Sequence, residues 1–151
     1  MTMYIFNENF TSLWYCGGVI LFNSDRTKVL IVETHSSSVG FTKGKREPGE
    51  TLLDTAHREV KEESGYDPDD YLHDMTVIGE KKSAKIHSIY FFIGTLKTKE
   101  LENKPLVFDK NELKRVCWIT IDQALQKLSP RKLDILNAAL NYFSNNINNN
   151  T

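Results

Sequence analysis

Apolar residues recur along this chain in short runs separated by polar turns, and these runs predict a domain built around a β-sheet. Residues 15–22 (YCGGVILF) and 28–33 (KVLIVE) are rich in β-branched residues, and the turn-like sequence NSDRT joins them. This arrangement predicts two strands in a hairpin. Gly17 and Gly18 weaken the first strand and indicate a bulge or a close approach of the backbone to a ligand.

The second half of the chain continues with strands and then changes to helical spacing. Three strands and a helix are predicted at residues 74–80, 86–95, 115–119 and 122–128. Ser129 followed by Pro130 is typical of a helix start. The apolar face of this last helix consists of Leu133, Leu136, Leu140 and Phe143. The whole pattern predicts an α+β fold in which a mixed sheet has helices on both sides.

Residues 51–65 predict a further helix, placed between the first two strands and the later ones. Thr51 is a suitable N-cap, Asp54 completes a capping box, and Gly65 is suited to end the helix in the left-handed conformation. An apolar stripe for packing on a core consists of Leu53, Ala56 and Val60. Just before this helix, Gly44, Pro48 and Gly49 predict a loop in which a backbone carbonyl can approach an ion.

Three carboxylates of this helix fall at i, i+3 and i+4 spacing, which places Glu59, Glu62 and Glu63 on one face. Carboxylates so placed repel one another unless a cation lies among them, and oxygen ligands suit Mg²⁺ or Mn²⁺. Arg58 precedes Glu62 by four residues and can pair with it. A solvated surface helix is the ordinary interpretation of such a charge run. The full pattern from Gly44 onward would occur by chance once in ~10⁸ positions, which favours a metal site.

Residues 44–66 (GKREPGETLLDTAHREVKEESGY) resemble the Nudix box, whose pattern is G-x5-E-x7-R-E-apolar-x-E-E-x-G-apolar. The matching positions are Gly44, Glu50, Arg58, Glu59, Val60, Glu62, Glu63 and Gly65, and Tyr66 is a mild departure at the last one. The resemblance implies a Nudix hydrolase with an α/β/α sandwich, formed here by one domain over residues 1–143. The Asn-rich segment 144–151 is predicted to be a disordered tail.

The resemblance also implies roles for individual residues. Glu59, Glu62, Glu63 and the Gly44 carbonyl would bind one to three Mg²⁺ or Mn²⁺ ions. Arg58 would hold the catalytic carboxylates, while Glu50 and Gly65 would be structural. A further glutamate from outside the box often serves as ligand or general base, and Glu112, six residues before Trp118, is the candidate here. Glu80 and Asp109 are weaker candidates for that role.

The segment GFTKGKREPGE resembles the corresponding segment of diadenosine tetraphosphate hydrolases and of some RNA 5′-end pyrophosphohydrolases. It implies that Lys43 contacts a phosphate chain. Tyr90 is expected to stack on a base or to bond a phosphate, and packing in the core is the alternative. The function expected first is asymmetric hydrolysis of diadenosine tetraphosphate to ATP and AMP. Alternatives are mRNA decapping or RNA 5′ pyrophosphohydrolysis and, in another class, a catalytically inactive Nudix domain that only binds its ligand.

Composition limits the kinds of protein that the chain can be, but it does not indicate a function. The chain has 151 residues, 40% of them apolar, which is enough for one domain with a buried core. Its formal net charge of −1 provides no general attraction to nucleic acid or to an anionic membrane. Cys16 and Cys117 are expected to be buried thiols. No apolar run is long enough to span a membrane, so we expect a soluble cytoplasmic protein that is a monomer or a homodimer.

Overall fold

A computed structural model describes residues 2–5, 15–80 and 88–149, and it shows one mixed sheet between two helical layers. Within these residues the strands are β1 (Thr2–Ile5), β2 (Tyr15–Phe22), β3 (Lys28–Thr34), β4 (Val39–Gly40), β5 (Thr42–Lys45), β6 (Tyr71–Glu80), β7 (Ser88–Leu96) and β8 (Leu113–Thr120). The helices are α1 (Leu52–Ser64), α2 (Ile121–Lys127) and α3 (Pro130–Asn149). The predicted α+β class is confirmed.

The central pair of the sheet is parallel, and its other ladders are antiparallel. The order is β1-β6-β7-β2-β3-β4, with β5 added to β2 and β8 added to β3. β2 runs parallel to β7 along its whole length. The predicted hairpin of β2 with β3 is present only at its base, where Phe22 faces Val29. Beyond that point the two strands diverge, because β2 pairs with β5 instead.

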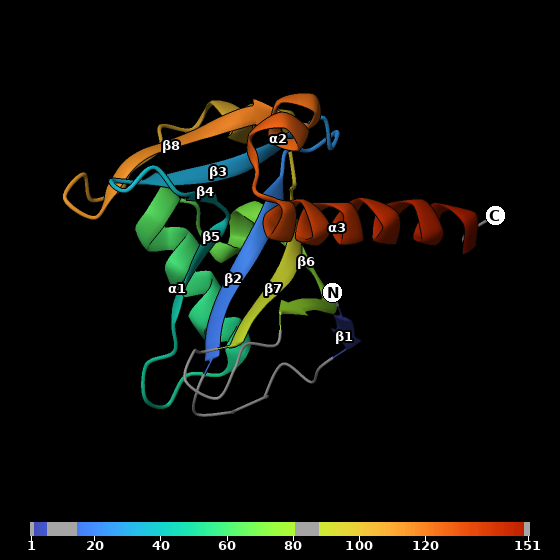
Figure 1. Ribbon diagram of the computed structural model, residues 1–151, viewed down its shortest axis with the longest axis horizontal. Helices are drawn as coiled ribbons and strands as arrows, with labels where there is room; N and C mark the ends of the chain where they lie inside the picture. Colours follow the sequence, from blue (N-terminus) through green and yellow to red (C-terminus); the bar gives the residue numbers. More distant parts are fainter. Residues whose placement is uncertain (1, 6–14, 81–87, 150–151) are drawn as a thin grey trace.

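The core has one cluster on each face of the sheet. Successive residues of β2 alternate between them, since Val19 and Leu21 belong to one cluster and Ile20 and Phe22 to the other. The first cluster includes the buried face of α1, and the second includes α2 and α3. Figure 1 shows α3 crossing in front of β2 and β7. A strand buried on both faces explains why residues 15–22 form a continuous apolar run.

Several boundaries differ from the sequence prediction. No strand was predicted at β4 or β5, because strands of two and four residues are too short to show a period of two. One turn of 3₁₀ helix, Pro68–Asp70, lies between α1 and β6. A second such turn, Lys99–Asn103, was not predicted.

The last helix is longer than predicted. α3 continues to Asn149, whereas a disordered tail was predicted from residue 144. Extending a helix that is already nucleated costs far less than starting one, so the asparagines can follow the packed first turns despite their modest propensity. Among residues 2–5, 15–80 and 88–149, no helix has both the length and the apolar composition needed to cross a membrane.

Candidate functional site

Helix α1 has both predicted caps. Thr51 Oγ1 accepts from the Asp54 N–H at 3.1 Å, and the Asp54 carboxylate accepts from the Thr51 N–H at 3.1 Å. At the other end Gly65 has φ of 90°, the left-handed conformation that favours glycine. The buried face differs slightly from the prediction, because Leu52 is fully buried while Leu53 is only partly so. The caps fix the ends of the helix that carries the box glutamates.

Arg58 connects α1 to the segment before it. Its Nε donates to Glu50 at 2.7 Å, its Nη1 to Glu59 at 2.8 Å and its Nη2 to the Lys45 carbonyl at 2.8 Å. A weaker contact of 3.3 Å reaches Glu62. The hydrogen bond to Glu50 is the main reason that the pKa of Arg58 lies above its usual range. Arg58 therefore remains charged and orients carboxylates on both sides of the loop.

Glu50 closes the loop between β5 and α1. One of its carboxylate oxygens accepts from the Glu47 N–H at 2.8 Å and from Thr55 Oγ1 at 3.0 Å. Burial alone would raise the pKa of Glu50, but the hydrogen bonds from Arg58, Glu47 and Thr55 lower it. These contacts agree with the structural role that the resemblance implied for Glu50.

Glu59 and Glu63, one turn apart on α1, face β5. Glu63 accepts from the Lys43 backbone N–H at 2.8 Å. The Glu59 carboxylate lies against Gly44, where the Cβ of any other residue would overlap it. Gly44 was predicted to lie in a loop, but it belongs to strand β5. Glu62 points elsewhere, with 54% of its side chain exposed against 12% for Glu59, so the three carboxylates do not share one surface equally.

Burial disfavours the ionised forms of Glu59 and Glu63, the two carboxylates that face β5. It raises the pKa of Glu63 to about 8, and the nearby charges of Glu59 and Glu112 act in the same direction. Burial also raises the pKa of Glu59, which Arg58 partly opposes. A cation between these carboxylates would favour their charged forms.

The residues around Gly44 fit a divalent cation such as Mg²⁺ or Mn²⁺. As placed, no three His, Cys, Asp or Glu side chains among the described residues are close enough to hold an ion by themselves. Mg²⁺, however, is usually held by one or two carboxylates and completes its shell with phosphate oxygens and water. Glu59, Glu63 and the Gly44 carbonyl, which the resemblance implies as ligands, would form such an incomplete set.

Glu112, the predicted glutamate from outside the box, lies near this site. It follows a turn in which its N–H donates to the Asp109 carbonyl at 3.1 Å. Its side chain is exposed, yet its charge contributes to raising the pKa of Glu63. Asp109 instead caps the turn by accepting from the Asn111 N–H at 2.9 Å. The Glu80 side chain lies outside the described residues.

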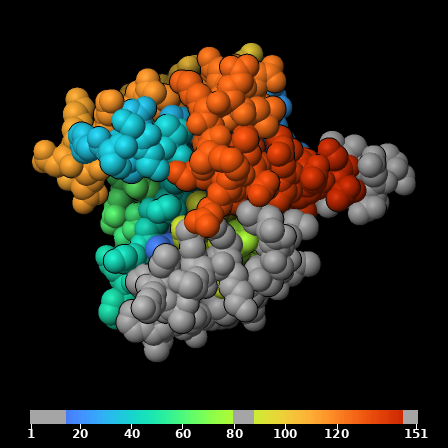
Figure 2. Space-filling view, in the orientation of Figure 1, coloured from blue at the N-terminus to red at the C-terminus, as the bar shows by residue number. Residues whose placement is uncertain are grey.

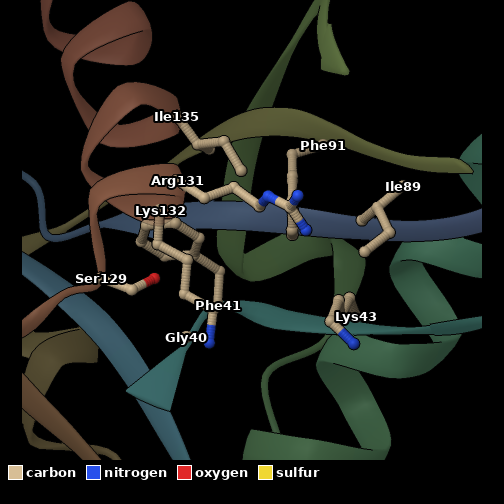
Figure 3. Close-up of a pocket in the computed structure, with 9 residues that line it drawn as sticks. All are labelled: Gly40, Phe41, Lys43, Ile89, Phe91, Ser129, Arg131, Lys132 and Ile135. Atoms are coloured by element: carbon tan, nitrogen blue, oxygen red, sulfur yellow. The ribbon is translucent and has the colours of Figure 1, made fainter. Parts of the chain in front are cut away.

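Two neighbouring cavities lie next to the glutamates. A small one of about 90 Å³ includes Glu63, Thr34, Ser38 and Leu113 in its lining. A larger one of about 330 Å³ lies between the sheet and the start of α3 (Figure 3), and its lining consists of Gly40, Phe41, Lys43, Ile89, Phe91, Ser129, Arg131, Lys132 and Ile135. Gly40, Phe41, Lys43 and Lys132 line both cavities. Together the cavities extend from Glu63 to an apolar floor formed by Phe41, Ile89, Phe91 and Ile135. The cations Lys43, Arg131 and Lys132 line the same larger cavity.

Strand register decides which aromatic residue reaches the larger cavity. Lys43 of β5, Gly18 of β2 and Phe91 of β7 form one row across the sheet. Gly18 has no side chain in this row because a Cβ there would overlap the Thr42 carbonyl. Tyr90 is in the adjacent row and points to the α1 side, where its ring packs against Tyr15 at 6.4 Å.

The two residues predicted to bind the substrate, Lys43 and Tyr90, therefore differ in position. Lys43 lines both cavities, while Tyr90 is not in the lining of either. The predicted site residues did not include Phe41, Phe91, Ser129, Arg131 or Lys132. One signal was available for the last two, since basic side chains in the first turn of a helix oppose the helix dipole. Phe41 and Phe91 had no such signal, because they resemble ordinary core residues.

One protein family and two yeast relatives match this chain. A protein-family model described as NUDIX domain matches residues 16–139. The chain is 34% identical over 102 residues to the mRNA-decapping enzyme subunit 2 and to the m7GpppN-mRNA hydrolase of Saccharomyces cerevisiae. That match covers 67% of this chain but only 10% of the length of these relatives.

Solved structures share the fold at low sequence identity. An Ap4A hydrolase of C. elegans in a binary complex has a TM-score of 0.73 and 14% identity, covering 87% of this chain and 98% of that one. The dihydroneopterin triphosphate pyrophosphohydrolase of E. coli has a TM-score of 0.62 and 18% identity, covering 80% and 90%.

Proposed function

Because this chain belongs to the NUDIX family of pyrophosphohydrolases, we propose that it cleaves a phosphoanhydride in a polyphosphate that joins two nucleosides. The observation that carries the proposal is the position of the larger cavity. Its aromatic floor and the cations Lys43, Arg131 and Lys132 lie beside a second cavity that contains Glu63. An aromatic floor suits a base, and ammonium and guanidinium groups suit phosphates.

Different side chains have different roles in the hydrolysis. The chemistry that a bound Mg²⁺ or Mn²⁺ supplies is neutralisation of phosphate charge, which otherwise repels the attacking water. Glu59 and Glu63 would provide its carboxylate ligands, and Arg58 orients Glu59. Glu112 accepts the proton of the attacking water, whose oxygen bonds to phosphorus as the bridging P–O bond breaks. The leaving phosphate takes the electron pair, so each product carries one terminal phosphate group.

Diadenosine tetraphosphate is the first candidate within this class, and its cleavage is asymmetric, to ATP and AMP. The motif at Lys43 and Gly44 and a near-neutral chain support it, since the net charge is −1. A free dinucleotide needs only the local cations of the two cavities. A long nucleic acid would need further basic contacts along its backbone.

Capped RNA is the second candidate, and the 34% identity to the yeast decapping proteins favours it. An m7GpppN cap also places a polyphosphate between two nucleosides, so the same cavities suit it. The two substrates differ in what extends beyond the second nucleoside. Contacts to an RNA backbone release counterions, and they make the affinity fall steeply as salt increases.

A parallel assay with Mg²⁺ separates these candidates. We would compare kcat/KM for diadenosine tetraphosphate, capped RNA, 5′-triphosphate RNA and ADP-ribose at low and moderate salt. The expected result is that diadenosine tetraphosphate has the highest value and a shallow salt dependence. A higher value for capped RNA, with a steep fall as salt increases, would replace the first candidate by the second.

The same assay addresses the inactive binding module. A protein that binds these ligands but hydrolyses none of them with Mg²⁺ or Mn²⁺ would be such a module. The presence of Glu59, Glu62 and Glu63 argues against it, because carboxylates placed so close destabilise a domain that gains no cation from them. Glu63→Gln is the control for contaminating hydrolases, since it should lose activity while it keeps its fold.

A further inference from the structure

Lys132 connects the first turn of α3 to the turn between β3 and β4. Its Nζ donates to Ser38 Oγ at 2.9 Å and also to the Val39 carbonyl. Gly40 makes this approach possible, because a Cβ at that position would lie 3.1 Å from Lys132 Nζ. In Figure 2 the surface of the β3–β4 turn, in cyan, lies directly against the orange surface of the α2–α3 region. The Lys132 ammonium group, 93 residues after Val39 in the sequence, thus reaches the edge of the candidate site.

The place of Lys132 relative to the two cavities is the central observation. It lines the small cavity that contains Glu63 and also the larger cavity with the aromatic floor. Lys43 is the other described cation that lines both, but its backbone N–H is bonded to Glu63, which places it at the glutamate end. Both lysines therefore border the space between the carboxylates and the apolar residues of the larger cavity, and Lys132 belongs to the α3 side.

The position of Lys132 at the start of α3 is electrostatically unfavourable for a cation. A side chain that served only for packing would not need a charge there. Lys132 and Arg131 lie in the first turn of α3, which contains no acidic residue. The positive end of the helix dipole disfavours cations there, and it favours an anion nearby. A polyphosphate in the two cavities would meet the helix end and both side chains.

We propose that Lys132 determines the preference for polyphosphate length: it contacts the phosphates on the α3 side, beyond those held at Glu63 and Lys43. This inference rests on the proposed function and specifies which members of the substrate class are preferred. A chain of two phosphates is held at the carboxylates and leaves Lys132 bonded to Ser38 and Val39. A chain of three or more phosphates extends to Lys132, which then exchanges the Val39 carbonyl for a charged phosphate oxygen. Since hydrogen bonds to charged groups are the stronger ones, this exchange favours the longer chain.

The test compares diadenosine compounds with two, three, four and five phosphates. Wild-type protein should give kcat/KM values that rise between two and four phosphates. Lys132→Met keeps the length of the aliphatic stem but removes the charge. It should lower kcat/KM for the tetraphosphate about tenfold or more, mainly through KM, and for the diphosphate by less than about threefold. Lys132→Arg should restore most of the preference, and Lys127→Met, an exposed change in α2, should leave the series unaltered.

Ser38→Ala separates recognition of phosphate from support of the turn. It removes one bond of the β3–β4 turn and leaves the Lys132 charge in place. If Lys132 only holds the turn, Ser38→Ala and Lys132→Met should lower all four values to a similar extent, and this result would overturn the inference. If Lys132 contacts phosphate, Ser38→Ala should retain the preference for long chains.

A binding measurement provides a second readout without turnover. Calorimetric titration with inorganic pyrophosphate and with tripolyphosphate should show that Lys132→Met weakens only the binding of tripolyphosphate. Equal weakening of both would contradict the length-reading role. Hydrolysis of neither the four diadenosine compounds nor capped RNA by wild-type protein would instead overturn the proposed function, so the two failures are distinguishable.

Discussion

The Glu59 carboxylate occupies the space beside Gly44 in which any other residue would carry its Cβ. Glycine at this position of β5 is therefore a requirement of the α1–β5 contact rather than of a flexible loop. The same contact places the Glu59 carboxylate against β5, and we propose that this carboxylate and the Gly44 carbonyl are both ligands of a hard cation.

Gly44→Ala should lower kcat by about 100-fold while the protein remains folded, because the new methyl group displaces Glu59 from its place. Steady-state kinetics with saturating Mg²⁺ and a circular dichroism spectrum provide the check. Gly49→Ala is the control. Gly49 has φ of 86°, but a Cβ there meets no atom within 4 Å, so stability should fall while kcat is retained. Equal activity in the two variants would contradict the role of Gly44.

Glu63→Gln should lower kcat about 10³-fold or more, because it removes a ligand charge and keeps the side-chain volume. The half-exposed Glu62 provides the comparison, and Glu62→Gln should have a clearly smaller effect. Both variants are measured over a range of Mg²⁺ concentrations. A loss below about tenfold for Glu63→Gln at saturating Mg²⁺ would remove the metal-site assignment.

Glu112→Gln should lower kcat at least as much as Glu80→Gln does, because Glu112 is close enough to Glu63 to influence its pKa. If Glu112 is the general base, the expected loss is about 10²- to 10⁴-fold, with KM little changed. Single-turnover rates of the two variants decide between these glutamates. Greater sensitivity at Glu80 would show that the wrong residue was selected from outside the box.

Phe91→Leu should raise the KM for a dinucleotide several-fold, because Phe91, although only 3% exposed, lines the larger cavity at the place proposed for a base. Tyr90→Leu is the matched change on the next residue of β7, whose side chain points to the α1 side. It should leave KM nearly unaltered. Measured KM values in the opposite order would favour the original prediction that Tyr90 contacts the substrate.

The free energy of unfolding should depend on pH through Asp70 and Lys104. Burial would raise the pKa of Asp70, but the hydrogen bond from Lys104 at 2.8 Å and one from the Asp67 N–H lower it. A carboxyl group with a depressed pKa stabilises the fold above its unfolded pKa of about 3.9, and this contribution is lost as pH falls through the folded pKa. Lys104→Gln should therefore be less stable than wild type at pH 7.

The difference between the two proteins should shrink as pH falls below about 4, which urea unfolding at several pH values would measure. Lys104 also lies 5.6 Å from the centre of the Tyr66 ring. Loss of the contact with Tyr66 does not depend on a carboxyl group. It therefore accounts for any difference in unfolding free energy that persists at low pH. A difference that stays constant between pH 7 and pH 3 would contradict the role of Asp70. Lys127→Gln serves as the exposed control.

The sequence by itself determined α1 and its ends. Thr51, Asp54 and Gly65 act through hydrogen bonds that reach three or four residues along the chain, so the local letters specify them completely. The spacing of Glu59 and Glu63 on one face followed from the same helical geometry. The strand β2 was also predicted with its observed bounds, because eight consecutive residues carry the pattern.

Only the tertiary structure decided what surrounds that helix. Whether Tyr90 or Phe91 reaches the cavity depends on the side of the sheet that each residue faces, and a shift of one residue exchanges the two. Lys132 reaches Val39 across 93 residues of sequence because α3 packs on the face of the sheet opposite α1. Such contacts depend on strand register and helix packing over the whole domain, and no local pattern of residues specifies them.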